Sequence, residues 1–390
     1  MPMGSIATWP GRRSTGYKPT LDSVAITWLE IFHPMTDMTS LERTLAVLDR
    51  KIPDRVPVAL HNFLMVCRMA GGDFSAILRS GEMLVEAELA AWREFGHDVI
   101  MHENGVCAEA EAMGCGIHYP SDGPAHVLDP VIKSPDDIDK LAVPDPETTF
   151  PLDEMLKATR ILVKETRGKV FVIGRADQGP MALAAALWGP ENLLLAAGDP
   201  LMRAKVRQLL EKCSRMNIVF GEAQRRAGAH GSSIGAYGHS LISPRMYNEL
   251  ELPGDKAFCD AMRRAECRSF VHSCGNETEL LENLVRSGAD CLELDPATDP
   301  AACKKATQGR TSVLGMLDPH GILSRGSVEQ VRQHTLEIMR VMAPGGGFLM
   351  GPGCALPSDT RPEVIHTIVE CAKTAGRYSS DGSLPHLGAA

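Results

Sequence analysis

From residue 151 onward, short apolar runs alternate with stretches of helical spacing, and this alternation limits the fold more than any other feature. The apolar runs are expected at residues 170–174, 232–236, 268–272, 290–294, 312–315 and 347–350. Parallel strands require long crossover connections, so such an alternation predicts a parallel sheet covered by helices. Two earlier runs, at 56–60 and 98–101, bring the count to about eight. The sequence therefore predicts an α/β fold, a closed TIM (β/α)8 barrel, rather than an open sheet.

One barrel domain accounts for most of the chain. We place it at residues 38–378, with Thr39 or Ser40 capping its first helix. Residues 1–37 are rich in glycine, proline, serine and threonine and lack periodicity, which predicts a poorly ordered N-terminal extension. Residues 379–390 are expected to be a flexible tail. The segment 114–131 is broken by glycine, proline and aspartate, which predicts a hairpin or a loop insertion.

Composition excludes several classes of protein. The formal net charge of −9 argues against a nucleic-acid binder, which needs a basic stripe. The sequence contains no run of about 18 apolar residues, so we expect no membrane span. Its 11 cysteines follow no disulfide spacing, and no secretory signal precedes them. These features predict a cytoplasmic enzyme with reduced thiols.

Polar and metal-capable side chains follow the predicted strands, at the end of the barrel where active sites lie. They are His102, Glu103, Gln178, Tyr237, His239, His272, Cys274, Glu293, Asp318 and Cys354. Each of them alone is compatible with packing or helix capping. His272 and Cys274 are two residues apart, so strand alternation places both on one face. Together with Cys354, in a glycine-flanked turn, they suggest a metal site, although the pattern alone leaves packed thiols equally open.

Two thiolates and one imidazole imply a particular chemistry. Three protein ligands leave one coordination position open, as in catalytic zinc sites. A substrate thiol in that position loses its proton and becomes a nucleophile at neutral pH. An ether or hydroxyl oxygen there is polarised, which makes its alkyl group a better electrophile. Both cases favour alkyl transfer over hydride transfer.

The segment Val271-His272-Ser273-Cys274-Gly275-Asn276 and the turn Gly351-Pro352-Gly353-Cys354 resemble the uroporphyrinogen decarboxylase superfamily. Further similar segments lie at 54–58, 134–138, 178–180, 241–247, 288–293 and 314–319, so the resemblance covers about residues 38–378. It implies a single (β/α)8 barrel. Decarboxylases of this superfamily carry an arginine-rich segment after the first strand, whereas residues 61–68 here hold one arginine. They also carry histidine where this chain has Cys354.

The resemblance points instead to the corrinoid-dependent methyltransferase branch, in which His-x-Cys and Pro-Gly-Cys bind zinc. It implies that His272, Cys274 and Cys354 are zinc ligands. It implies a methyl group moving between cobalamin and a small methyl donor or acceptor, such as a methyl ether or the thiol coenzyme M. The chain lacks a corrinoid-binding Asp-x-His-x-x-Gly, so a partner corrinoid-binding protein is expected to supply the cobalamin. The alternative function is uroporphyrinogen decarboxylation.

Four further residues are candidates for the site. Glu103 is the first candidate for a fourth zinc ligand, although capping a helix is an equally open role for it. Tyr237 and His239 are candidates for substrate contact or proton transfer. Gln178 is a candidate for binding cofactor or substrate through a hydrogen bond. A homodimer and a zinc-stabilised binding module without catalysis also stay open.

Overall fold

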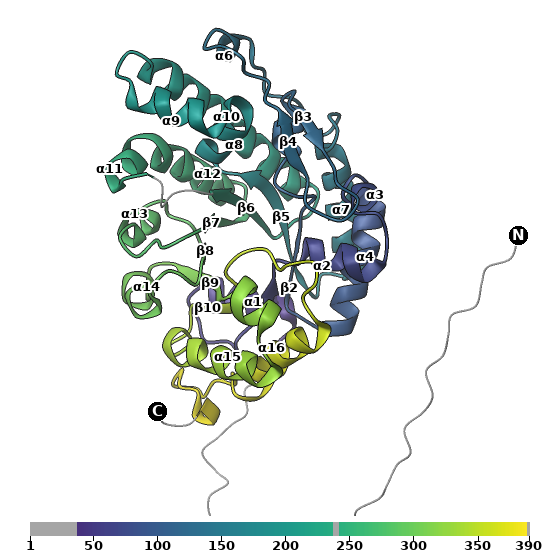
Figure 1. Ribbon diagram of the computed structural model, residues 1–390. Coiled ribbons are helices and arrows are strands. Elements are labelled where there is room, and N and C mark those ends of the chain that lie inside the picture. Colours follow the sequence, from purple (N-terminus) through teal and green to yellow (C-terminus); the bar gives the residue numbers. More distant parts are fainter. Residues whose placement is uncertain (1–36, 237–241, 388–390) are drawn as a thin grey trace, which may run out of the picture. The chain divides into compact units, whose positions relative to one another are not determined.

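A barrel of parallel strands forms the centre of the protein in the computed structural model, which describes residues 37–236 and 242–387 (Figure 1). Its hydrogen-bonded strands follow one another in the order β1-β2-β5-β6-β7-β8-β9-β10. They are β1 (Ala59–Leu60), β2 (Val99–His102), β5 (Phe171–Gln178), β6 (Gly231–Ala236), β7 (Arg268–Ser273), β8 (Cys291–Leu294), β9 (Ser312–Leu317) and β10 (Phe348–Pro352). The eight-stranded parallel sheet confirms the predicted TIM barrel.

The first and last strands approach each other closely, which brings the sheet round on itself. A parallel bridge joins Val58 to Met350 just before β1. The amide of Met350 donates to the carbonyl of Pro57 at 2.8 Å. A side chain on Gly351 would place its Cβ 2.3 Å from the backbone oxygen of Ala59. Only glycine therefore allows β10 to lie this close to β1.

Helices surround the barrel, as the crossover connections require (Figure 1). They are α1 (Ser40–Leu48), α2 (Phe63–Ala70), α3 (Phe74–Leu78), α4 (Gly81–Phe95), α5 (Ala108–Ala112), α6 (Asp137–Lys140), α7 (Leu152–Glu165), α8 (Pro180–Trp188), α9 (Pro190–Gly198), α10 (Arg203–Arg226), α11 (Pro244–Met246), α12 (Leu252–Arg264), α13 (Leu281–Val285), α14 (Pro300–Thr307), α15 (Val328–Met342) and α16 (Pro362–Thr374). Shorter π or 3-10 turns are η2 (Tyr247–Glu251), η3 (Pro319–Leu323) and η4 (Pro385–Leu387).

Helix α1 lies across the amino-terminal ends of the strands. Its Val47 and Leu48 are fully buried and join an apolar cluster with strand residues such as Phe171 and Phe270. Thr39, one of the two caps that the sequence suggested, begins the helix and forms a capping box with Glu42. The buried guanidinium of Arg43 pairs with carboxylates of Asp54 and Asp98, both at 2.6 Å. Helix α1 therefore fills the end of the barrel opposite the predicted site.

The other end of the barrel carries two insertions. Between β2 and β5, the antiparallel pair β3 (Gly116–His118) and β4 (His126–Asp129) forms the hairpin predicted for residues 114–131. Between β5 and the crossover helix α10, the chain forms α8 and α9. The segment Gly198-Asp199-Pro200 separates α9 from α10.

Residues 379–387, part of the segment predicted to be a flexible tail, make defined contacts with the barrel domain. The side chain of Leu387 is buried, and its carbonyl accepts from the guanidinium of Arg340. The carbonyl of Gly382 accepts from the amide of Gly345 at 3.0 Å. The C-terminal segment therefore packs against α15 and the loop that leads into β10. Across the part of the chain that the structure describes, we find no helix both long and apolar enough for a bilayer.

Candidate metal centre

Three potential metal ligands meet at the carboxyl end of the barrel. His272 lies within β7, and Cys274 follows it by two residues on the same face. Cys354 comes from the turn after β10, 80 residues further along. A Cβ on the preceding Gly353 would lie 2.5 Å from Pro296 and 2.6 Å from the backbone oxygen of Leu294. This glycine lets the turn pack against the end of β8 and brings Cys354 to the other two ligands.

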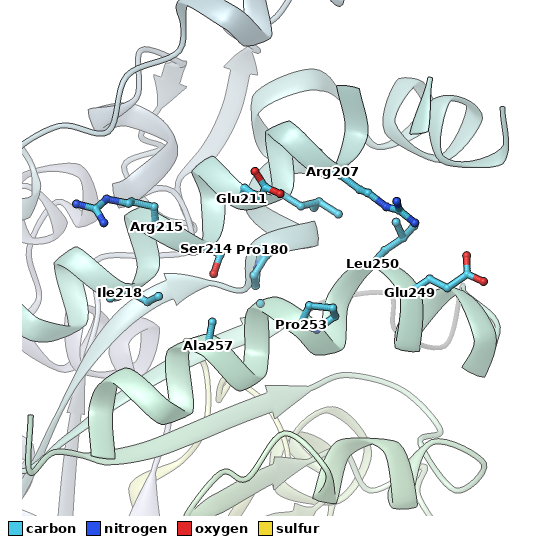
Figure 2. Close-up of a pocket in the computed structure, with 12 residues that line it drawn as sticks. Pro180, Arg207, Glu211, Ser214, Arg215, Ile218, Glu249, Leu250, Pro253 and Ala257 are labelled. Carbon is cyan, nitrogen blue, oxygen red and sulfur yellow. The ribbon is translucent and has the colours of Figure 1, made fainter. Parts of the chain in front are cut away.

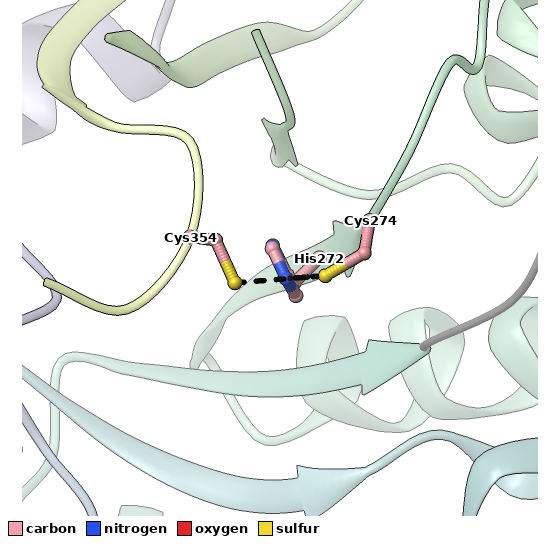
Figure 3. A group of neighbouring side chains, drawn as sticks. All are labelled: His272, Cys274 and Cys354. Atoms are coloured by element: carbon pink, nitrogen blue, oxygen red, sulfur yellow. Dashed lines mark hydrogen bonds between the residues drawn. The ribbon is translucent and has the colours of Figure 1, made fainter. Parts of the chain in front are cut away.

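The three side chains point toward one another (Figure 3). Nε2 of His272 lies 2.9 Å from Sγ of Cys274, and Sγ of Cys274 lies 3.6 Å from Sγ of Cys354. All three ligand atoms lie within 4.8 Å of one another. His272 is buried, whereas both cysteines are half-buried. The cluster is therefore held within the barrel end but stays accessible from one side.

The donor set and its spacing fit zinc. Two sulfurs bound tetrahedrally at the usual Zn–S length of about 2.3 Å lie about 3.8 Å apart, close to the observed 3.6 Å. A tetrahedral Zn–N bond of about 2.0 Å places nitrogen and sulfur about 3.5 Å apart. The 2.9 Å between His272 and Cys274 would need to lengthen slightly. Two thiolates with an imidazole are also the soft donors that select zinc over magnesium or calcium.

The two thiols share one ionisation between them. The hydrogen bond from Cys274 lowers the pKa of Cys354, and His272 lowers it further. The same hydrogen bond raises the pKa of Cys274. One thiolate is therefore already favoured without a metal, and a bound cation would favour the second.

Glu293 on β8 lies beside the other nitrogen of the His272 ring. Its Oε2 lies 3.5 Å from Nδ1 of His272, while Nε2 faces the cysteines. Glu293 is fully buried, and its burial opposes ionisation. The nearby His272 and His61 nevertheless keep the pKa of Glu293 well below its usual range. A carboxylate on one ring nitrogen orients the other nitrogen toward a metal and makes it a better ligand.

His61 lies between Glu293 and a second buried carboxylate, Glu103. Its Nδ1 is 3.1 Å from Glu293, and its Nε2 is 3.1 Å from Glu103. Burial alone would lower the pKa of His61, but the two carboxylates raise it to about 10. His61 is therefore an imidazolium at neutral pH, and it joins the ends of β1, β2 and β8.

Arg175 completes this buried group of charges from the middle of β5. Its Nε lies 2.6 Å from Glu103, and its Nη1 lies 3.6 Å from Glu293. Arg175 and His61 carry two positive charges, and the two carboxylates carry two negative charges, so the group is neutral. Burial opposes the ionisation of Glu103, but Arg175 and His61 lower its pKa. The metal cluster thus lies beside a preorganised, electrically balanced network.

The candidate residues divide into three groups. His272, Cys274 and Cys354 come together, as expected. Glu103 lies in the charge network and is not part of the three-ligand group among the described residues, so its role as a fourth ligand stays a prediction. Tyr237 and His239 lie outside the described residues.

Gln178 and two further strand-end residues have defined contacts. Nε2 of Gln178 donates to the carbonyl of Val106 at 3.3 Å. His102 faces away from the barrel interior and bonds Thr159 of α7 at 2.8 Å. The carboxylate of Asp318 accepts backbone amides at the start of η3. His102 and Asp318 therefore have structural roles.

Sequence reasoning did not assign a role to His61 or Arg175. The signal for Arg175 is a charged residue directly after the apolar run 170–174, because a buried charge needs a partner. His61 gave a weaker signal, since it follows a very short strand. Neither pattern identifies the partner carboxylates.

Comparison with known proteins supports the expected family. Residues 39–375 match the family model described as Uroporphyrinogen decarboxylase (URO-D). The methylcobamide:CoM methyltransferase MtbA of Methanosarcina acetivorans is 30% identical over 367 residues, which cover 87% of this chain and 99% of the relative. A uroporphyrinogen decarboxylase of Magnetococcus marinus is 24% identical over 357 residues, 87% of this chain and 98% of the relative.

A solved structure has the same fold. It is described as a methyltransferase from Methanosarcina mazei and superposes with a TM-score of 0.79 at 20% identity. The match covers 86% of this chain and 98% of the other. The methyltransferase MtbA shares more sequence identity with this chain than the decarboxylase does. This agrees with the methyltransferase branch that the His-x-Cys and Pro-Gly-Cys pattern indicated. The chain is a member of the uroporphyrinogen decarboxylase family.

Proposed function

We propose that this protein is a zinc-dependent methyltransferase that moves a methyl group between a corrinoid held by a partner protein and a small substrate. The observation that carries the proposal is the convergence of His272, Cys274 and Cys354 within 4.8 Å at the open end of the barrel. The similarity to a methylcobamide:CoM methyltransferase supports the corrinoid part. Bound zinc would supply a Lewis acid that lowers the pKa of a thiol or polarises an ether oxygen.

Two directions of transfer fit this site. With a methyl ether, the carbon–oxygen bond breaks, the methyl group passes to cobalt(I), and the alkoxide takes up a proton to become an alcohol. With a thiol, the sulfur loses its proton and takes the methyl group from methyl-cobalt(III), which leaves cobalt(I). In both directions, His272, Cys274 and Cys354 would bind the zinc that contacts the reacting oxygen or sulfur. The half-buried position of the two cysteines leaves an approach for the second reactant.

The charge network has a positioning role in this proposal. Glu293, itself paired with His61, would orient the His272 ring through its 3.5 Å approach to Nδ1, so that Nε2 stays directed toward the cysteines. Because His61 and Arg175 balance the two carboxylates, the network adds no net charge beside the site. Glu103 as a fourth ligand, and Tyr237 and His239 as substrate contacts, remain part of the proposal. A homodimer and a cytoplasmic location remain predictions.

Uroporphyrinogen decarboxylation is less well supported. Its substrate carries several carboxylates, which need cations at the barrel end. The decarboxylases carry an arginine-rich segment after the first strand. In this chain His61 lies there, and it already pairs with two carboxylates. Arg68 is the one arginine of this segment, and it is exposed and stacks over Phe74.

Methyl transfer can be measured with purified protein, zinc and free or protein-bound cobalamin. Cob(I)alamin should be methylated by methyl ethers, or methylcobalamin should be demethylated by thiols, and absorbance follows both reactions. Zinc removal should abolish the activity and zinc addition should restore it. Turnover of uroporphyrinogen by the Cys354→Ala variant, together with no methyl transfer by the zinc-loaded protein, would reject the proposal.

A further inference from the structure

A cavity of about 250 Å³ opens beside the carboxyl ends of β2 and β5. We call it the Gln178 cavity, and its lining includes Val106, Ala125, Val127, Gln178, Ala182 and Ala186. These residues come from the end of β5, the loop after β2, the β3–β4 hairpin and α8. The cavity thus lies at the same end of the barrel as the metal cluster, beneath the two insertions that this chain carries there.

The strand register gives its distance from the metal cluster. Gln178 pairs with Gly235 of β6, and Gly235 pairs with His272 of β7. Neighbouring strands lie about 4.8 Å apart, so the backbones of Gln178 and His272 are about 10 Å apart. A molecule of one ring's length can therefore occupy the cavity and still extend toward the metal cluster.

The lining favours an uncharged ligand. Six of the twelve residues that line it are alanine or valine, and the described lining includes no lysine, arginine, aspartate or glutamate; its ionisable members are His126 and Cys107. A sulfonate or carboxylate would lose hydration there and gain no lysine or arginine in return, only the exposed imidazole of His126, which makes its burial costly. A volume of about 250 Å³ suits a molecule about the size of one aromatic ring.

Gln178 provides one directed polar group in this apolar setting. Its Nε2 donates to Val106, and its backbone carbonyl accepts from Asn217 at 2.7 Å. The first bond holds the side-chain amide and the second holds the backbone at this position, and the residue is only 8% exposed. Its Oε1 accepts no hydrogen bond from the described residues. An acceptor held in this way recognises a hydroxyl donor.

A larger cavity, of about 470 Å³, lies between α10 and α12 (Figure 2). Apart from Pro180, its lining comes from residues 207–218 of α10 and residues 249–257 of η2 and α12. It therefore opens on the helical wall, and Arg207, Arg215, Glu211 and Glu249 are among the residues that line it. Nothing in the structure shows what would cover it, so we assign it no ligand.

We propose that the Gln178 cavity binds the small-molecule reactant, an uncharged and mainly apolar compound that donates a hydroxyl group to Oε1 of Gln178. The inference rests on the proposed function, since it takes the reactant to be the partner of the metal cluster. It also selects among substrates, because a hydroxylated methyl ether fits the lining and a thiol sulfonate does not.

Calorimetric titration of the zinc-loaded protein tests this assignment without any corrinoid. The probes are 2-methoxyphenol, methoxybenzene, which lacks the hydroxyl, and 4-methoxybenzenesulfonate, which is charged and has no thiol to bind zinc. We expect 2-methoxyphenol to bind most tightly. Gln178→Leu should weaken 2-methoxyphenol about fivefold to tenfold and leave methoxybenzene unchanged, because one neutral hydrogen bond is lost.

A second variant tests the cavity itself. Ala186 is half-buried on α8, and Ala186→Leu should weaken both uncharged probes at least tenfold by filling the space. Ala302 is a half-buried alanine on α14 outside the cavity, so Ala302→Leu is the matched control and should change neither. Zinc content and circular dichroism confirm that each variant is folded.

The outcomes separate the two proposals. Tightest binding of the sulfonate, or aromatic binding that neither Gln178→Leu nor Ala186→Leu alters, would overturn the cavity assignment. Binding that follows the expected pattern, in a zinc-loaded protein that transfers no methyl group to or from any corrinoid, would support the cavity and reject the proposed function.

Discussion

Replacing Arg175 by methionine tests whether the buried charge network is a balanced unit. Its guanidinium lies 2.6 Å from Glu103, and both side chains are at most 3% exposed. At an effective dielectric constant of about 20, the attraction across this distance is about 6 kcal/mol. Part of that offsets desolvation, so Arg175→Met should lower the free energy of unfolding by about 3–5 kcal/mol. Urea unfolding at pH 8 measures this loss.

The double variant Arg175→Met with Glu103→Gln separates lost packing from an unpaired charge. If the unpaired carboxylate of Glu103 causes the loss, removing its charge should recover about 2–3 kcal/mol. The loss should also shrink as the pH falls. In the wild type, Arg175 and His61 lower the pKa of Glu103, so its stabilisation is present above the unfolded pKa and disappears toward acid. A loss below about 1 kcal/mol, or strictly additive variants, would refute this reasoning.

Three further substitutions give distinct readouts. Glu293→Gln should weaken zinc binding about 10-fold to 100-fold in competition with a chromogenic chelator, because the carboxylate holds the Nδ1 side of the ligating histidine; unchanged affinity would contradict this. Burial lowers the pKa of His102 in the folded protein to about 4, from about 6.5 in the unfolded chain. The folded protein therefore keeps its full stability above about pH 6.5 and loses part of it as the pH falls toward 4, because the unfolded chain takes up the proton first. The His102→Gln variant should therefore lose less stability than the wild type between pH 7 and pH 4.5, and parallel urea series that coincide would argue otherwise. Gly351→Ala should cost about 3 kcal/mol or more, since its Cβ would lie 2.3 Å from a backbone oxygen of β1. Gly198→Ala, where a Cβ meets nothing within 4 Å, should cost under 1 kcal/mol in the same thermal unfolding assay.

The barrel was predictable because burial repeats regularly along the chain. The barrel strands are mostly buried on both faces and read as apolar runs, and the crossover helices each have an apolar face. The same alternation placed His272 and Cys274 on one face of β7. The approach of Cys354, from 80 residues away, followed from the family resemblance and not from spacing.

The charge network could not be predicted in the same way. Its members come from β1, β2, β5 and β8, and which of them meet depends on strand register and side-chain direction. His102 and Glu103 show the difficulty, because adjacent residues at one strand end face opposite ways. His102 packs against α7, whereas Glu103 points to Arg175 inside the barrel.

Zinc held by three protein side chains, with a fourth position open to a reactant, is the feature on which the proposed chemistry depends. X-ray absorption at the zinc edge, with and without a substrate thiol, measures it directly. Two sulfurs at about 2.3 Å and one nitrogen at about 2.0 Å should be present, with one further light ligand that the thiol replaces by a third sulfur. Loss of one sulfur in Cys354→Ser would identify that ligand. A zinc ion with four protein ligands that no thiol or ether displaces, or a protein that binds no zinc, would contradict the proposed mechanism.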